Sequence, residues 1–310
     1  MPKARTCAIT INYKGADDTA ACVASLSQST VPVSIVVVDN TPNDPDLEKA
    51  LLPFLDDIKL IRAPENLGFG RGNNLGIDWA LANTDCEFIL IFNNDAMVKP
   101  DTIRQLEAAM NLHPEAGIVT ARIVLAEDET KLWYGGGEVD WRRGGGRVPG
   151  VLGPANTPLA LRARHVTFAS GCAMMVRSDI LRQLGGFDSR FFMYEEDLEL
   201  SLRVQKDGWR IWYESAAIIK HLGQGSMRKE GEKFLGLLWA DNPNLPFYVF
   251  HIIQNRLINM SMNAHGWNKV MFYLFFPLFV FKLCVRFVAK KRWDGLKAMS
   301  RAFHSFRTLS

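Results

Sequence analysis

The chain has 310 residues, of which 48% are hydrophobic and 22% charged, so it can form a real core and is not a wholly disordered protein. Its net charge of +3 is too small to indicate a nucleic-acid-binding protein. Length alone permits two small domains or one large α/β domain with additions.

Strand and helix signals alternate over the first hundred residues. The strand-like runs cover residues 7–13, 33–38, 58–62 and 87–92, and helical segments cover 19–27, 47–55 and 72–82. The run VSIVVV at 33–38 is apolar almost throughout, as in a strand that is covered on both faces. This alternation predicts an α/β fold with a mostly parallel central sheet flanked by helices.

Polar clusters follow three of these strands. They are Asp39-Asn40-Thr41, the glycine-rich segment 66–76 (NLGFGRGNNLG) and Asn93-Asn94-Asp95. Each cluster alone is typical of a turn. Ligands of such sheets bind beyond the carboxyl ends of the strands, so three clusters on one edge predict a binding site there.

The glycine-rich segment is not a dinucleotide fingerprint. Counted from Gly70 and Gly72, the position of the third glycine is occupied by Leu75, and the segment follows the third strand instead of the first. Its backbone N–H groups, with the amides of Asn66, Asn73 and Asn74, can still contact a phosphate or a sugar.

Three further features could carry chemistry. Asp95 could bind a divalent cation that bridges phosphate oxygens, although capping a turn is the simpler role. Glu195-Glu196-Asp197 precede a helical segment at 198–206, where acids favour the helix dipole. The apolar run before them would raise their proton affinity, which suits a general base. His221 follows another strand-like run, and a lone histidine is more often structural than a ligand.

The middle of the chain, residues 126–163, is rich in Gly and Pro and predicts a long mobile excursion from the sheet. Long loops of this kind are often lids over a site, but they can also be disordered. A strand-like run, FASGCAMMV, resumes at 168–176, and a helix is expected from about Ser178.

Taken in order, INY, VVVDN, ENLGFGRGNNLGI, FNND, SGCAMMVR, GGFDSRFFMYEEDLELSLR and the Lys220-His221 turn resemble the family 2 glycosyltransferases. The similarity runs from about residue 7 to 256 and is strongest to the bacterial branch with rhamnosyltransferases of cell-surface polysaccharide synthesis. It implies a GT-A nucleotide-diphospho-sugar transferase fold with a Mg²⁺ or Mn²⁺ site. Asn93 stands where the common Asp-x-Asp metal motif has its first Asp.

The resemblance also implies roles for individual residues. Asp39 would read the nucleotide base, with Asn12 and Asn66 nearby, and Asp95 would hold metal and diphosphate, with His221 as a further ligand. Asp197 would be the catalytic base, and Glu196 is the competing assignment. The remaining implied contacts are with the nucleotide sugar (Gly72, Asn73, Asn94) and on the acceptor side (Gly171, Tyr194, Glu195).

The implied reaction is an inverting transfer of a sugar, with dTDP-rhamnose favoured and other dTDP- or UDP-sugars open, onto a saccharide or lipid-linked saccharide. A lid at 135–153 would exclude water from the donor. Two rivals remain: a nucleotide-sugar-binding protein without turnover, and a nucleotidyltransferase. Released nucleoside diphosphate indicates a transferase, whereas pyrophosphate indicates a nucleotidyltransferase.

The C-terminal quarter is apolar and basic. Residues 270–288 approach the length of a membrane span, but Pro277, Lys282 and Arg286 argue against full insertion. Residues 296, 299, 303 and 306 are apolar at helical spacing. From residue 267 onward the chain contains nine Lys or Arg and only one acidic residue. This pattern predicts helices that lie on an anionic membrane. The alternative is packing on the catalytic domain or on a second subunit, such as a homodimer.

The expected organisation is a catalytic domain at 1–262 and an amphipathic basic helical region at 263–310. The domain would contain a nucleotide-sugar half at 1–125, a flexible loop at 126–165 and an acceptor and catalytic half at 166–262. Five dispersed cysteines indicate reduced thiols, and no apolar signal segment follows the N-terminal charges. We therefore expect a cytoplasmic protein attached peripherally to the inner face of the plasma membrane.

Overall fold

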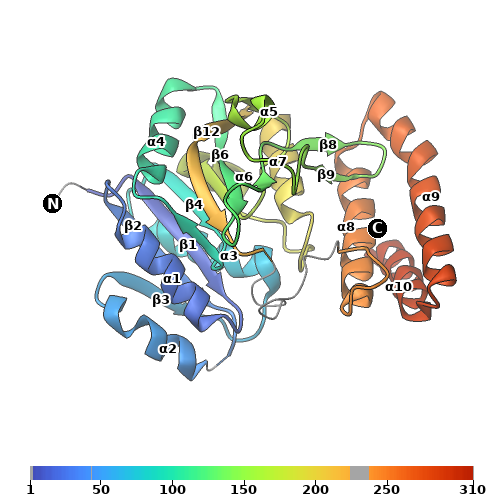
Figure 1. The fold of residues 1–310 in the computed structure, drawn as a ribbon, viewed down its shortest axis with the longest axis horizontal. Coiled ribbons are helices and arrows are strands. Elements are labelled where there is room, and N and C mark those ends of the chain that lie inside the picture. The colour runs from blue at the N-terminus through green and yellow to red at the C-terminus, as the bar shows by residue number, and fades with distance from the viewer. Residues whose placement is uncertain (1–2, 43, 224–236, 310) are drawn as a thin grey trace.

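The structure is a computed structural model, and it describes residues 3–42, 44–223 and 237–309. Its N-terminal half contains four parallel strands in the order β3-β2-β1-β4 (Figure 1). The strands are β1 (Thr6–Asn12), β2 (Val33–Asp39), β3 (Ile58–Arg62) and β4 (Phe88–Phe92). The helical segments between them are α1 (Ala16–Ser27), α2 (Pro45–Leu51), η1 (Leu52–Phe54) and α3 (Gly68–Asn83). The predicted alternation is confirmed, with α3 beginning four residues earlier than expected.

The sheet continues through strands of mixed direction. β11 (Ala173–Arg177) lies antiparallel between β4 and β6 (Ala116–Leu125), and β6 is parallel to β12 (Arg210–His221). Three short strands complete it at its edges: β5 (Ala96–Val98), β7 (Leu132–Tyr134) and β10 (Arg164–Val166). The α/β class is confirmed. A larger share of the strand pairs is antiparallel than the apolar runs indicated.

Helices cover both faces of the sheet. A Cβ on Gly76 of α3 would overlap the side chain of Ile9, whereas the next residue, Thr10, faces Cys22 of α1. Because side chains alternate along a strand, α1 and α3 lie on opposite faces. The other main helices are α4 (Thr102–Leu112), α6 (Ser178–Leu184) and α7 (Glu196–Lys206). All five residues of β4 are buried, so the core runs through the middle of this sandwich.

The Gly- and Pro-rich middle segment contains short elements where the sequence analysis expected none. Besides β7 and β10 it forms a hairpin of β8 (Glu138–Asp140) and β9 (Gly145–Arg147), and the helix α5 (Pro158–Leu161). Elements of three or four residues are too short for a hydrophobic period to be visible. The lid function of residues 135–153 stays a prediction.

Three long helices form a separate layer at one end of the molecule (Figure 1). They are α8 (Leu245–Asn263), α9 (Gly266–Ala289) and α10 (Trp293–Leu309). α8 packs on α7, and α10 packs on α8. The apolar residues of α10 expected to face a membrane are partly internal, since Met299 is 3% exposed and its sulfur lies 3.5 Å from the Cys284 sulfur. For α10 the packing alternative therefore applies.

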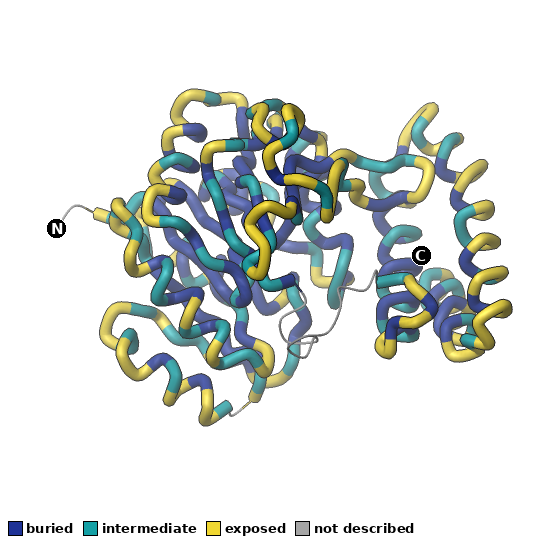
Figure 2. Tube along the Cα trace, viewed as in Figure 1, coloured by how far each residue is buried: buried dark blue, intermediate teal, exposed yellow. Residues whose placement is uncertain are grey.

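The outer side of α9 remains uncovered (Figure 2). The helix runs through Pro277 and is long and apolar enough to cross a membrane, by length and composition alone. Phe272, Phe276, Leu283 and Phe287 are buried on its inner side. Its exposed apolar side chains are Trp267, Val270, Tyr273, Leu274, Phe275, Leu278, Phe281, Val285 and Val288.

Candidate active site

The carboxyl ends of β1 and β2 place Asn12 and Asp39 side by side. The Asn12 amide nitrogen donates to Asp39 Oδ1 at 3.3 Å, and the backbone N–H of Thr41 donates to the same oxygen at 3.0 Å. Asp39 Oδ2 accepts no hydrogen bond from the described residues, and Arg62 Nη1 lies 3.9 Å away. Burial raises the pKa of Asp39. One buried carboxylate oxygen is therefore available to an N–H donor of a ligand.

Asn40 fixes the start of the glycine-rich segment. Its amide nitrogen donates to Asn66 Oδ1 and to the Gly68 carbonyl, both at 3.1 Å, and its Oδ1 accepts from the Leu67 N–H at 2.9 Å. Asn66 Oδ1 also accepts from the Gly68 N–H at 3.0 Å. Asn66 thus lies next to the Asp39 edge, as expected, and Asn40 organises the turn that holds it.

Glycines of this segment allow α3 to pack closely against neighbouring parts of the fold. Gly68 has φ +77°, and a Cβ there would overlap the Phe192 carbonyl. At Gly72 a Cβ would lie 3.1 Å from Ile11 Cδ1. Asn73 is fully buried and its amide nitrogen donates to the Phe69 carbonyl, whereas its Oδ1 has no partner among the described residues. Contacts of Gly72 and Asn73 with a nucleotide sugar stay a prediction.

Asn74 joins the same helix to a neighbouring loop. Its side chain donates to the Phe187 carbonyl at 2.8 Å and accepts from the Phe187 N–H at 2.7 Å. Both ends of its amide are thus engaged within the fold. The sequence grouped it with the phosphate-contacting amides, and the structure gives it a role in joining segments.

The acidic end of β4 meets the end of β12. His221 Nε2 lies 2.9 Å from Asp95 Oδ1, and the Asn93 amide nitrogen lies 3.4 Å from the same ring nitrogen. Asn94 instead donates to Thr19 Oγ1 at 3.0 Å, a hydroxyl that also bonds Asn12 Oδ1 at 3.1 Å. The lone histidine therefore returns to the same edge as the polar clusters.

The fit of this pair to a metal ion can be judged from its donors. Within the described residues there is no group of three or more His, Cys, Asp or Glu side chains placed to hold a metal. Asp95 and His221 offer one oxygen and one imidazole nitrogen, and both side chains are over 90% buried. Mg²⁺ in nucleotide sites is commonly held by one or two carboxylates plus substrate phosphates and water, so this pair fits a site that the diphosphate completes.

Without a metal ion, the electrostatics of the pair favour a protonated imidazole, and His221 would have to release that proton to act as a metal ligand. Burial lowers the pKa of His221, but the Asp95 carboxylate and the Cys172 thiol outweigh it and raise this pKa well above its ordinary value. The ring also packs edge-on against Trp133, with ring centroids 4.4 Å apart. The histidine is held in one orientation by these contacts.

Asp197 and Glu196 begin α7 beside the β11 loop. The backbone N–H of Gly171 donates to Asp197 Oδ2 at 2.9 Å, and the Leu198 N–H donates to Oδ1 at 2.8 Å. Burial raises the pKa of Asp197 to about 6. Burial and the charge of Asp197 raise the pKa of Glu196 well above its ordinary value, and Glu196 Oε2 has no partner among the described residues.

The turn that precedes these carboxyls, residues 193–195, is strained. Tyr194 and Glu195 have φ values of 71° and 67°, in the left-handed region that bulky residues rarely adopt. The Asn255 amide donates to the Met193 and Tyr194 carbonyls at 2.9 and 2.7 Å, and Arg256 Nε bonds Glu195 Oε1 at 2.7 Å. The conformation is therefore held from α8.

Sequence reasoning missed these α8 residues. Asn255 and Asn259 lie one helical turn apart in a largely apolar helix, and Arg256 follows Asn255 directly. The Asn259 amide nitrogen lies 3.4 Å from the Glu195 carbonyl. Polar residues at i and i+4 in a buried helix would have been the available signal, because buried polar groups require partners.

The separate groups are joined by one chain of contacts along the sheet edge. Asp39, Asn12, Thr19 and Asn94 are linked by their side chains. The Asn93 N–H bonds the Cys172 carbonyl at 3.0 Å, and the neighbouring Gly171 holds Asp197. The residues predicted at the nucleotide end and the predicted base thus lie along one connected edge of the sheet, and their membership of one site stays a prediction.

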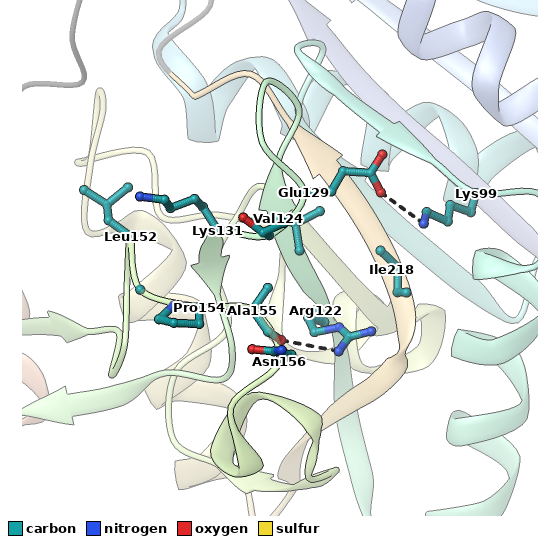
Figure 3. Close-up of a pocket in the computed structure, with 12 residues that line it drawn as sticks. Lys99, Arg122, Val124, Glu129, Lys131, Leu152, Pro154, Ala155, Asn156 and Ile218 are labelled. Atoms are coloured by element: carbon teal, nitrogen blue, oxygen red, sulfur yellow. Dashed lines mark hydrogen bonds and ion pairs between the residues drawn. The ribbon is translucent and has the colours of Figure 1, made fainter.

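A cavity of about 480 Å³ lies away from this edge (Figure 3). Arg122, Val124 and Ile218 point into it from β6 and β12. His221 stands three positions after Ile218 on the same strand, so its side chain faces the opposite side of the sheet. No sequence-predicted site residue lines this cavity, and we do not assign the active site to it.

Residues 7–185 match the family described as "Glycosyl transferase family 2". The chain is 28% identical over 227 residues to an "N-acetylglucosaminyl-diphospho-decaprenol L-rhamnosyltransferase" of Mycobacterium tuberculosis, covering 66% of this chain and 72% of the relative. It is 27% identical to the "Low-salt glycan biosynthesis hexosyltransferase Agl10" of Haloferax volcanii, of which it spans 62%. It is 26% identical to the "Rhamnosyltransferase WbbL" of Escherichia coli, over 47% of this chain and 57% of the relative.

Solved structures share the fold. A structure of GalNAc-T7 with UDP, GalNAc and Mn²⁺ has a TM-score of 0.62 at 16% identity, covering 83% of this chain and 48% of that one. The mannosyltransferase PcManGT from Pyrobaculum calidifontis, in complex with GDP-Man and Mn²⁺, has a TM-score of 0.55 at 13% identity, covering all of this chain and 76% of that one. These likenesses confirm the GT-A fold.

Proposed function

Because the chain belongs to glycosyl transferase family 2, we propose that it transfers a sugar from a nucleotide-sugar donor to an acceptor hydroxyl, with Asp197 as the base. The observation that carries this proposal is the placement of Asp197 Oδ2 on the Gly171 N–H, at the edge that also carries Asp39 and Asp95. A carboxylate whose pKa is raised to about 6 is ionised at neutral pH and basic enough to assist a hydroxyl.

At the donor end, Asp39 supports recognition of the nucleotide. Its Oδ2, which accepts no hydrogen bond from the described residues and lies 3.9 Å from Arg62 Nη1, would accept an N–H of a pyrimidine base, and Asn12 keeps Oδ1 occupied. A dTDP- or UDP-sugar fits this reading, and the rhamnosyltransferase names of two relatives favour dTDP-rhamnose. Asp95 and His221 would hold Mg²⁺ or Mn²⁺ against the diphosphate, and that ion would stabilise the leaving group when bound.

The proposed chemistry is a single displacement with inversion. The acceptor hydroxyl gives its proton to Asp197 as its oxygen attacks the anomeric carbon, and the bond from that carbon to the nucleoside diphosphate breaks. Burial and the charge of Asp197 raise the pKa of Glu196 well above its ordinary value, which favours its neutral form beside the base.

The proposed acceptor is a lipid-linked saccharide at the cytoplasmic face of a membrane. The outer side of α9 exposes several large apolar side chains, while Lys282 and Arg286 on the same helix are also exposed. Exposed apolar surface of this extent with flanking cations is typical of membrane contact. All five cysteines are free thiols, as in a reducing compartment.

The test is release of nucleoside diphosphate from a panel of dTDP-, UDP- and GDP-sugars, with Mg²⁺ or Mn²⁺ and membrane lipid extract. We expect release from one donor by the wild type and its loss in Asp197→Asn. Asp207→Asn, at the C-terminal end of the same helix, is the matched control and should keep full activity. Donor binding without release under every condition would favour the binding protein without turnover, and pyrophosphate release would favour a nucleotidyltransferase.

A further inference from the structure

A second, smaller cavity of about 190 Å³ lies where the β8–β9 hairpin meets α8 and α9. Arginine is its commonest charged residue: Arg143 and Arg147 come from the hairpin and Arg256 from α8. Asp140 and the ring of Phe279 also line it. We call it the arginine cavity. Its volume is below the roughly 300 Å³ at which sites for whole small-molecule ligands begin, so it suits a single functional group.

Two of the arginines are held close together by their packing against Phe279 and by the close approach of the hairpin to α8. The guanidinium groups of Arg143 and Arg256 lie 5.9 and 5.5 Å from the centroid of the same ring, that of Phe279. A Cβ on Gly145 would overlap the Arg256 guanidinium, so the hairpin backbone approaches α8 as closely as only glycine permits. Two positive charges are thus held against one apolar surface. This arrangement favours the binding of an anion between them.

Each arginine has an acidic neighbour, and two of these pairings are weak. Arg143 Nε lies 3.8 Å from Asp140 Oδ2, and Arg147 pairs with Glu138 in a setting where both side chains are at least half exposed. Exposed pairs of this kind contribute little and exchange readily. Arg256 uses its Nε for Glu195, and a guanidinium has five N–H donors in total. An incoming anion can therefore be bound at this cavity without displacing the buried pair.

The location of the cavity connects the membrane side to the base. Arg256 bonds Glu195, which directly precedes Glu196 and Asp197, and Phe279 belongs to α9. An acceptor that enters from the membrane along α9 would pass this cavity before its saccharide reaches Asp197. The group of such an acceptor that lies between lipid and saccharide is a phosphate or diphosphate.

We propose that the arginine cavity binds the diphosphate that links lipid to saccharide in the acceptor. This assignment rests on the proposed function and adds a subsite to it. Arginine is suited to the role, because its planar fork matches phosphate oxygens in a bidentate way. The cavity would then discriminate diphosphate-linked acceptors from uncharged glycosides of the same saccharide.

The experiment compares two soluble acceptors that carry the same saccharide, one on a short alkyl diphosphate and one as an uncharged alkyl glycoside. Arg143→Gln and Arg147→Gln each remove one charge from the exposed hairpin. We expect the KM for the diphosphate acceptor to rise about tenfold in each variant, with the KM for the donor and the kinetics of the uncharged glycoside unchanged. Arg142→Gln is the matched control, since Arg142 lies in the same turn but against Phe275 and outside the cavity.

Other outcomes overturn the proposal. Equal use of both acceptors by the wild type, or a rise in donor KM in the variants, would show that the arginines do not read the acceptor diphosphate. If the variants lose binding to vesicles of anionic phospholipid while the acceptor KM stays unchanged, the arginines bind phospholipid headgroups instead.

A direct binding measurement separates this inference from the proposed function. The alkyl diphosphate is titrated into metal-free protein, so that a metal-bound diphosphate does not interfere. Binding that weakens in Arg143→Gln but not in Arg142→Gln supports the site even if no donor is turned over, in which case the transferase proposal fails alone. Absence of binding, together with active transfer to the glycoside, overturns the site and leaves the transferase intact.

Discussion

The side-chain amide of Asn255 donates a hydrogen bond of 2.7 Å to the backbone carbonyl of Tyr194, sixty-one positions earlier in the chain. Tyr194 and Glu195 both have positive φ, a conformation that costs on the order of 1–3 kcal/mol per residue. The next two residues, Glu196 and Asp197, are the first two of α7. A contact made by a C-terminal helix therefore sets the direction in which the proposed base points.

Asn255→Ala should lower kcat by at least about tenfold and leave the KM for the donor unchanged, because only the base is displaced. Steady-state kinetics with the identified donor measure both values. Gln254→Ala is the control, since that neighbouring side chain bonds Ser305 of α10 and not the turn. Equal losses in both single variants would assign Asn255 a general structural role.

The pH dependence distinguishes the two carboxyls of α7. With a pKa of about 6, Asp197 loses its proton as pH rises, so activity should increase through about pH 6 and level off above it. Asp197→Asn should lose at least about a hundredfold in kcat. Glu196→Gln should retain most activity at pH 7, because burial and the charge of Asp197 raise the pKa of Glu196 and so favour its neutral form, which Gln resembles. A larger loss in Glu196→Gln than in Asp197→Asn would reverse the assignment.

The same shift predicts how stability depends on pH. The pKa of Asp197 is about 6 in the folded protein against an ordinary 3.8, so the folded state binds more protons between these values. Stability from this group is complete below about pH 4 and is lost as pH rises through about 6. The loss is on the order of 2–3 kcal/mol. Asp197→Asn removes this titration but leaves only one acceptor oxygen for the Gly171 and Leu198 N–H groups, so it is the reference for the pH dependence and not for absolute stability. Thermal unfolding at pH 5 and 7.5 should show the wild type losing stability between these values relative to Asp197→Asn.

Asp39→Asn should weaken binding of the nucleoside diphosphate by about tenfold, because a buried carboxylate oxygen that can accept an N–H is replaced. Isothermal titration with UDP and dTDP measures the change and shows which base is preferred. Asp46→Asn, exposed on α2, provides the comparison. Unchanged affinity in Asp39→Asn would remove this residue from the nucleotide site.

Leu278→Glu combined with Phe281→Glu should abolish flotation with anionic vesicles. The two side chains are 55% and 65% exposed on the outer side of α9, where a charge prevents burial in lipid without disturbing the inner packing. Leu112→Glu, at an exposed leucine on α4, tests the effect of charge alone. If the double variant floats like the wild type, α9 faces another partner.

The residues at the strand ends could be predicted because a parallel sheet has a simple rule. Polar residues that follow a buried strand lie at the carboxyl end of the sheet, where ligands bind. This rule predicted that Asp39 and Asp95 lie at that edge, where the structure also places Asn12. The pairing of His221 with Asp95 required β12 to return to that edge, and only a resemblance suggested it. The fold class followed from the same alternation of strands and helices.

Contacts between distant segments were beyond the reach of local patterns. The support of the 193–195 turn by Asn255 depends on how α8 packs. The hydrophobic periodicity of α8 predicts a helix but not the segment against which it packs. The glycines of α3 illustrate the same limit, since the sequence did not show that Gly72 and Gly76 pack against Ile11 and Ile9. The sugar contact of Gly72 stays a prediction. For α10, an amphipathic pattern could not distinguish a membrane from the surface of α8.

The dependence of the 193–195 turn on α8 sets a rule for choosing fragments of this protein. A fragment that ends at residue 185, where the reported family match of residues 7–185 ends, would keep Asp39 and Asp95 but lose Asp197 and His221. One that ends just before α8 would keep all four side chains, yet its turn would have no Asn255 to hold it. We expect such a fragment to bind nucleotide and fail to transfer sugar. An activity screen on it would then report an inactive protein only because α8 had been removed.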